Sequence, residues 1–125
     1  MKTGFVAKVT SFSDDGYATL LAFADNLHEP ANYLMLDLAN EPDEQERQLG
    51  LQGVHVDTGA FNVEGYDLVQ NVSETDTGVV VTLTASAAMK AGIGQDIEIE
   101  LDSKVIDGTP IGEALRRFTD RLSSL

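Results

Sequence analysis

The chain has 125 residues and 42% of them are hydrophobic, which is enough for one domain with one core, so we do not expect wholesale disorder. Its 21 acidic and 8 basic side chains give a formal net charge of −13, which repels nucleic acids and anionic membranes and favours encounter with a basic protein. The absence of cysteine excludes disulfides, thiolate metal sites and cysteine nucleophiles.

The first half of the chain predicts four strands. Residues 4–12 alternate partly between apolar and polar types, and the turn SDDG separates them from a second, mostly apolar strand at residues 17–24, which gives a hairpin. Residues 33–38 (YLMLDL) are nearly continuous in apolar character, so we place this third strand at the centre of the sheet. Residues 51–57 lead into a fourth strand, in which valines alternate with a histidine.

An acidic connection joins the third and fourth strands. Its residues 43–49 (DEQERQL) are polar helix formers, Pro42 suits the first helical position after Asn40 or Glu41 as cap, and Gly50 suits the end. The segment is too short to be stable as an isolated helix. We therefore predict either a short helical turn or an ordered loop.

Three more strands are expected in the second half. Residues 63–72 predict a fifth strand, bulged at Gly65, and the turn ETDTG leads to a sixth strand at residues 79–83, which is rich in β-branched side chains. In residues 96–101 (DIEIEL), apolar and acidic side chains alternate cleanly. This one-sided pattern is typical of an antiparallel sheet with one face in water.

A short helix is expected between the sixth and seventh strands. Thr84 or Ser86 can cap it, residues 87–91 form it, and Gly92 ends it.

The clearest helix pattern lies at residues 109–125, where Thr109 suits the N-cap and Pro110 the first helical position. Apolar side chains recur there at helical spacing, which forms a stripe that can pack on a sheet or on a second copy of the chain. The candidates for an oligomer interface are Leu115, Phe118 and Leu122. A homodimer through this helix is therefore one expectation.

Charge is unevenly distributed along the chain. Residues 1–103 hold 18 acidic and 4 basic side chains, whereas residues 104–125 hold 3 acidic and 4 basic ones. Arg116, Arg117 and Arg121 suit the C-terminal end of a helix dipole. They could also dock on an acidic face of the same chain or of another subunit.

These elements together predict an α+β fold. We expect a single domain over residues 1–125, with a β-rich core at 4–102 and the C-terminal helix at 109–125. The core would be a mostly antiparallel sheet of about six to seven strands with one short helix.

Few residues suggest chemistry. His28 lies in a proline-bounded loop, and His55 alternates with two valines and so points to the more solvent-facing side, but neither has the neighbours of a metal site. Acidic side chains near the central connection, and the acidic stripe of residues 96–100, fit solvated faces better than a catalytic pair or a calcium site. We expect no cofactor, no bound metal and no enzyme activity.

The N-terminus lacks the apolar segment of a signal peptide. The longest apolar run, residues 20–24, is too short to cross a bilayer. We therefore expect a soluble cytoplasmic protein.

The central stretch resembles the Imm10-type immunity proteins of bacterial polymorphic toxin systems. Four short segments in order carry the resemblance: YLML at 33–36, DEQE at 43–46, LG at 49–50 and VHVD at 54–57. The alanine-rich helix that ends at Gly92 and the strand IEIEL at 97–101 are also similar. The resemblance covers roughly residues 4–102 and leaves out the C-terminal helix.

This resemblance implies a small binding protein that neutralises a cognate toxin and has no catalytic residues. An acidic surface would complement a basic toxin and speed association. The residues expected to bind the partner surround the central connection: Asp43, Glu44, Glu46, Arg47, His55 and Asp57.

Two alternatives remain open. The chain could be an oligomerising structural domain that uses the apolar stripe of its last helix, and its acidity could serve solubility alone. The weaker alternative is a small enzyme that uses clustered carboxylates or a bound divalent ion.

Overall fold

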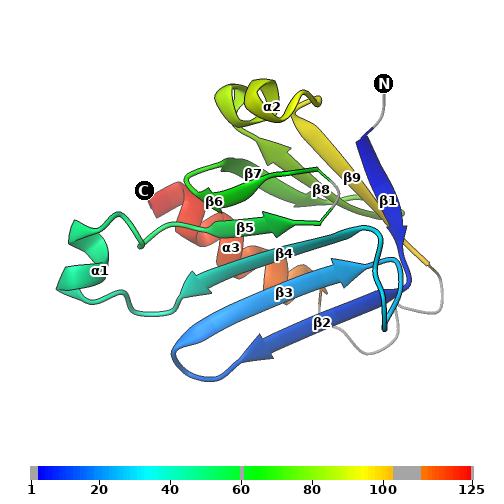
Figure 1. The fold of residues 1–125 in the computed structure, drawn as a ribbon. Coiled ribbons are helices and arrows are strands. Elements are labelled where there is room, and N and C mark those ends of the chain that lie inside the picture. Colours follow the sequence, from blue (N-terminus) through cyan, green and yellow to red (C-terminus); the bar gives the residue numbers. More distant parts are fainter. Residues whose placement is uncertain (1–2, 60, 103–110, 125) are drawn as a thin grey trace.

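The computed structural model describes residues 3–59, 61–102 and 111–124, which form nine strands and three helices (Figure 1). The α+β fold is confirmed. The strands form two sheets instead of the single sheet that we expected.

The larger sheet, sheet B, has five strands in the order β2-β3-β4-β5-β6, and every neighbouring pair is antiparallel. Its strands are β2 (Val9–Asp14), β3 (Ala18–Ala24), β4 (Tyr33–Ala39), β5 (His55–Thr58) and β6 (Glu64–Tyr66). β4 is the middle strand, as its apolar sequence predicts. The predicted hairpin is also confirmed, since Phe12 pairs with Leu21.

The smaller sheet, sheet A, has the order β1-β9-β8-β7. Its strands are β1 (Thr3–Ala7), β7 (Val69–Glu74), β8 (Gly78–Leu83) and β9 (Asp96–Leu101). β7, β8 and β9 are antiparallel neighbours, whereas β1 pairs parallel to β9. As predicted from the alternation in β9, Ile97 and Ile99 are buried and the acidic side chains between them are exposed.

Two predicted strands are wrong in the same way, which explains why there are more strands than the expected six to seven. The strand predicted at 4–12 divides at Lys8 into β1 and β2, and the strand predicted at 63–72 divides at Asp67 into β6 and β7. In each case the chain crosses from one sheet to the other. The φ angle of Asp67 is +61°, so the second crossing uses a left-handed residue.

Both short helices form, with caps that differ in part from the prediction. α1 (Glu44–Gln48) is capped by Asp43, not by Asn40 or Glu41, because Asp43 and Glu46 form a reciprocal capping box. Gly50 follows this helix with a φ angle of +76°, a conformation that glycine adopts without a Cβ clash.

α2 (Ala85–Ala91) is capped by Thr84, whose hydroxyl accepts a hydrogen bond from the Ala87 amide, and it ends at Gly92. It begins two residues earlier than predicted. Its buried residues, Ala87 and Ala88, join the core.

α3 (Ile111–Ser124) packs behind the sheets in the view of Figure 1. Phe118 is fully buried, Leu115 is 4% exposed, and Leu122 is partly buried against the core. The apolar stripe therefore packs on the sheets of its own chain, and a homodimer through these side chains would require α3 to leave them. The predicted cap at Thr109 and Pro110 lies outside the described residues.

One hydrophobic cluster includes buried residues of both sheets, α2 and α3. Of the helices in the described ranges, none is long and apolar enough to cross a membrane.

Candidate binding surface

Sheet B has two faces, and the inner face is the one that α3 covers. Successive strand residues point to opposite sides, and the buried members Thr19, Leu21, Phe23, Leu34 and Leu36 all share this inner parity. The inner face is thus part of the core.

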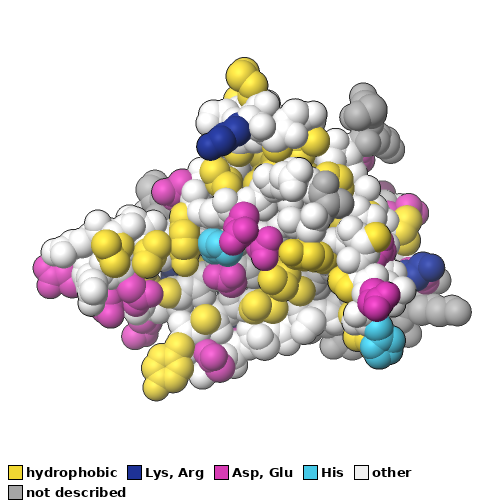
Figure 2. All heavy atoms as spheres, in the orientation of Figure 1, with side chains coloured by type: hydrophobic (Ala, Val, Ile, Leu, Met, Phe, Trp, Pro, Cys, Tyr) yellow, Lys and Arg dark blue, Asp and Glu magenta, His cyan; other side chains and the backbone are white. Residues whose placement is uncertain are grey.

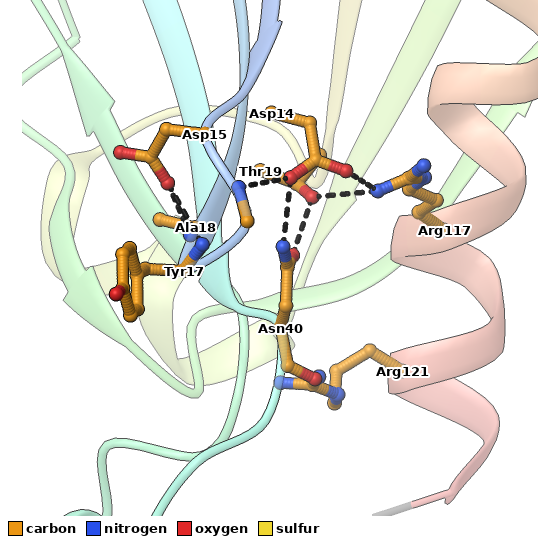
Figure 3. Close-up of polar contacts among 9 residues, drawn as sticks. Asp14, Asp15, Tyr17, Ala18, Thr19, Asn40, Arg117 and Arg121 are labelled. Carbon is orange, nitrogen blue, oxygen red and sulfur yellow. Dashed lines mark hydrogen bonds and ion pairs between the residues drawn. The ribbon is translucent and has the colours of Figure 1, made fainter.

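A polar network at one end of the inner face fixes α3 to the sheet (Figure 3). Arg117 donates hydrogen bonds to the carboxylate of Asp14 and, over 3.1 Å, to the hydroxyl of Thr19. Its guanidinium also lies 5.9 Å from the ring centroid of Phe12. Arg117 therefore docks on an acidic site of its own chain, which is one of the two roles expected for the C-terminal arginines.

The carboxyl of Asp14 is the electrostatic centre of this network. Hydrogen bonds from the backbone N–H of Gly16, then from the side chains of Asn40 and Arg117, lower the pKa of Asp14 to about 2. Arg121, one turn further along α3, donates to the carbonyl oxygens of Gln52 and Asn40 over 2.8 and 3.0 Å. These bonds connect the end of α3 to both ends of the connection that carries α1.

The opposite side, which we call the outer face, is the side that faces the viewer in Figures 1 and 2. Strand register places its side chains in two rows that run across the strands: Leu20, Asp37, His55 and Tyr66 in one, and Ala22, Met35, Asp57 and Glu64 in the other. Except for the exposed Glu64, all of them are half-buried. Figure 2 shows acidic side chains and a histidine next to hydrophobic ones over this sheet.

His55 lies at the centre of a polar cluster on the outer face. Its Nδ1 atom is 3.2 Å from Oδ2 of Asp37 on the neighbouring strand β4. On the other side, its ring meets the ring of Tyr66 edge to face, with 4.9 Å between centroids. The sheet backbone thus holds a carboxylate, an imidazole and a phenol in one row.

The environment of Tyr66 shows that this region is negative. Burial, followed by the charges of Asp37 and Glu46, raises the pKa of the Tyr66 hydroxyl above its ordinary value of 10.0. Glu46 comes from α1, so this helix extends the negative region beyond the sheet. A hollow between α1 and the β2–β3 turn is lined by Tyr17, Asp37, Glu41, Glu46 and Tyr66, among others.

The structure brings together only part of the predicted binding set. His55 lies on the outer face, as expected from its alternation with the valines, Asp57 lies on the same face, and Glu46 lies beside it. Asp43 caps α1 and Glu44 is exposed in its first turn. Arg47 lies apart from the hollow beside Tyr66 and lines another hollow, which it shares with Arg121.

Several outer-face residues were not predicted. Asp37, Met35 and Leu20 lie in strands that we interpreted as mostly apolar, and Tyr66 and Glu64 lie in a strand that we predicted as longer. The informative pattern was the acid at the fifth position of YLMLDLA, on the parity of Tyr33 and Met35. An ionisable residue at that position indicates that this side of the central strand is not core.

Among the described residues, no group of three or more histidine and acidic side chains is arranged to hold a metal ion. The outer face presents carboxylates directly beside apolar side chains.

Comparison with known proteins adds one match. The family model described as Imm10, immunity protein 10, matches residues 6–107. The matched range contains all of sheet B, both short helices and sheet A except the first residues of β1, and it ends before α3. A search of curated proteins finds no match.

Proposed function

Because this chain belongs to the Imm10 family of immunity proteins, we propose that it neutralises a cognate toxin by binding it directly. Family membership carries this proposal. The surface chemistry supports it, since residues 9–66, which include all of sheet B, hold 11 acidic side chains and a single basic one, Arg47.

The binding surface that we propose consists of α1 and the nearby part of the outer face. Its residues are Asp43, Glu44, Glu46, Arg47, His55 and Asp57. A negative surface of this kind raises the association rate with a basic toxin and suppresses encounters with acidic proteins. Neutralisation needs no chemical step, because occupying the toxin surface is sufficient.

The proposed site of action is the bacterial cytoplasm, where such a chain would protect the cell that makes the toxin. Acidity favours a basic partner such as a nuclease-like toxin domain, because a protein that binds nucleic acid presents cationic surface. The proposal therefore includes the charge of the partner as well as its class.

The experiment is co-purification of this chain with the toxin domain encoded by the neighbouring gene, together with a growth assay in cells that express that domain. We expect a stable complex and restored growth. A folded wild-type chain that neither co-purifies with the toxin domain nor restores growth would overturn the proposal.

A pair of matched variants tests the location. Glu44→Lys with Asp57→Lys changes the proposed surface without removing the capping box of α1, and should weaken the complex at least about tenfold. Asp76→Lys with Glu100→Lys makes the same change in net charge on exposed residues of sheet A and its turn, and should bind like the wild type. Equal binding by both double variants would place the toxin on another surface.

A further inference from the structure

The outer face of sheet B combines apolar and acidic side chains in a way that neither the core nor an ordinary solvated face requires. Leu20, Ala22 and Met35 occupy neighbouring positions on β3 and β4, and Asp37 and Asp57 lie directly beside them in the strand register. No helix of the described residues lies over this side of the sheet in Figure 1.

The two rows of the outer face contain carboxylates, and none of the described side chains in these rows is a lysine or an arginine that could pair with them. The carboxylate of Asp37 contacts the ring of His55. The charge of Asp37 also contributes to the raised pKa of the nearby Tyr66, so it acts along the row. Covering these carboxylates with a neutral surface would cost desolvation energy without compensation.

We infer that the outer face is the centre of the toxin-binding surface, and that it takes a protein surface with an apolar centre next to arginine or lysine side chains. This inference rests on the proposed function and specifies the chemistry of the partner. The apolar centre packs on Leu20 and Met35, and the partner's cations pair with Asp37 and Asp57. An arginine suits this position best, because its planar guanidinium pairs with a carboxylate and stacks on the ring of a tyrosine.

The edge of the outer face supplies an aromatic anchor. Tyr17, in the turn between β2 and β3, is 84% exposed and points away from α3 in Figure 3. It lines the hollow that Glu46 and Tyr66 share. Exposed tyrosines dominate many protein interfaces because they bury a large area and lose little conformational entropy.

The sheet face by itself is smaller than a typical interface. β2, β3 and β4 have six or seven residues, whereas β5 has four and β6 has three. With strands about 4.8 Å apart and about 3.3 Å per residue, the face spans at most roughly 20 by 20 Å. A standard interface buries about 800 Å² of accessible surface on each partner. The partner therefore also contacts the neighbouring hollow, with α1 on one side and Tyr17 on the other.

The test measures the affinity of the purified toxin domain for four folded variants by calorimetry. Met35→Arg puts a cation and extra volume at the centre of the outer face, and we expect an affinity loss of about 100-fold or more. Its control is Val80→Arg, which makes a similar change at a half-buried position of sheet A. We expect that control to change affinity less than about threefold.

The second pair tests the aromatic anchor. Tyr17→Ala should weaken binding about tenfold. Met89→Ala on α2 removes a side chain of comparable exposure, 82%, and should leave binding unchanged. Thermal unfolding of each variant confirms that it is folded.

The outcomes separate the two proposals. Wild-type affinity in Met35→Arg, or an equal loss in Val80→Arg, would overturn the inference about the outer face and leave the proposed function standing. Failure of the wild-type chain to bind the toxin domain at all would overturn both. Binding that is insensitive to salt concentration would contradict the cationic partner, because charge pairing at an accessible face is screened.

Discussion

The two faces of sheet B are built from the same five strands, yet their side chains differ in burial and in charge. On the inner face the side chains are buried in the hydrophobic cluster that includes both sheets and α3, and the polar ones have partners: Thr19 bonds to Asn40, and Thr58 bonds to the backbone of Val63. On the outer face the side chains are mostly half-buried and include two aspartates and a histidine. The comparison teaches that folding determines one face and leaves the other available for recognition.

The largest effect should come from the contact between α3 and the inner face. Phe118→Ala removes a fully buried ring, so we expect the free energy of unfolding to fall by about 3–5 kcal/mol in urea titrations. Met35→Ala on the outer face removes a half-buried side chain, and should cost less than about 1.5 kcal/mol. Similar losses for the two variants would contradict the distinction between the faces.

Two adjacent residues of β5 give a sharper form of the comparison. Thr58 is 5% exposed, and its hydroxyl accepts from the Val63 amide over 3.1 Å and can donate to the Val63 carbonyl at 3.2 Å. Thr58→Val leaves the Val63 amide without its partner, whereas the Val63 carbonyl keeps the hydrogen bond from the Thr58 backbone N–H, so unfolding free energy should fall by about 1–3 kcal/mol. Asp57→Asn, on the outer face, should change it by at most about 0.5 kcal/mol. A larger effect at Asp57 than at Thr58 would reverse our assignment of the two faces.

A smaller effect concerns pH. Folding lowers the pKa of Asp14 from 3.8 to about 2, so the folded state favours the ionised form. The resulting stabilisation is complete above pH 3.8 and is lost as the pH falls from there toward 2. Asp14→Asn lacks this contribution, so its urea midpoint should fall less than that of the wild type over this pH range.

The control for the pH experiment is an acid without the network. Asp76→Asn, in the exposed turn between β7 and β8, should keep the acid sensitivity of the wild type. Parallel curves for the wild type and Asp14→Asn would show that the contact with α3 does not depend on the Asp14 charge.

The smallest effect is spectroscopic and concerns the outer face. In a variant with Tyr17→Phe and Tyr33→Phe, the ultraviolet absorbance reports on Tyr66 alone, and its pKa should lie above 10.0. Adding Asp37→Asn should lower that pKa without returning it to 10.0, because burial is the larger cause. An unchanged pKa would mean that Asp37 does not act on this ring.

Local patterns predicted much of the fold and less of the surface. The hairpin of β2 and β3, the central place of β4, the end of α2 at Gly92 and the apolar stripe of α3 all depend on neighbouring residues, and all are confirmed. Of the two caps predicted for α2, Thr84 and Ser86, the structure has Thr84. The cap of α1 was predicted at the wrong residue because the segment offered Asn40, Glu41 and Asp43. Only the reciprocal bond between Asp43 and Glu46 distinguishes them.

The binding surface was predicted only in part, because its contacts join residues on different strands. Alternation correctly placed His55 on the side opposite its neighbouring valines. It could not place Tyr66 beside His55 or Asp37 across from it, because those contacts depend on the register between strands. The charged residues of α1 formed one group in the sequence, but in the structure Glu46 and Arg47 line different hollows.

The sequence by itself determined that this protein has an acidic α+β fold, which residues of each strand share a face, and the family that the central stretch resembles. Only the tertiary structure decided that the strands form two sheets, with crossings at Lys8 and Asp67, and that α3 contacts the inner face of sheet B through Arg117. The reason is physical. Alternation gives every strand two faces, but packing between residues far apart in the chain decides which face becomes core and which stays accessible to a partner.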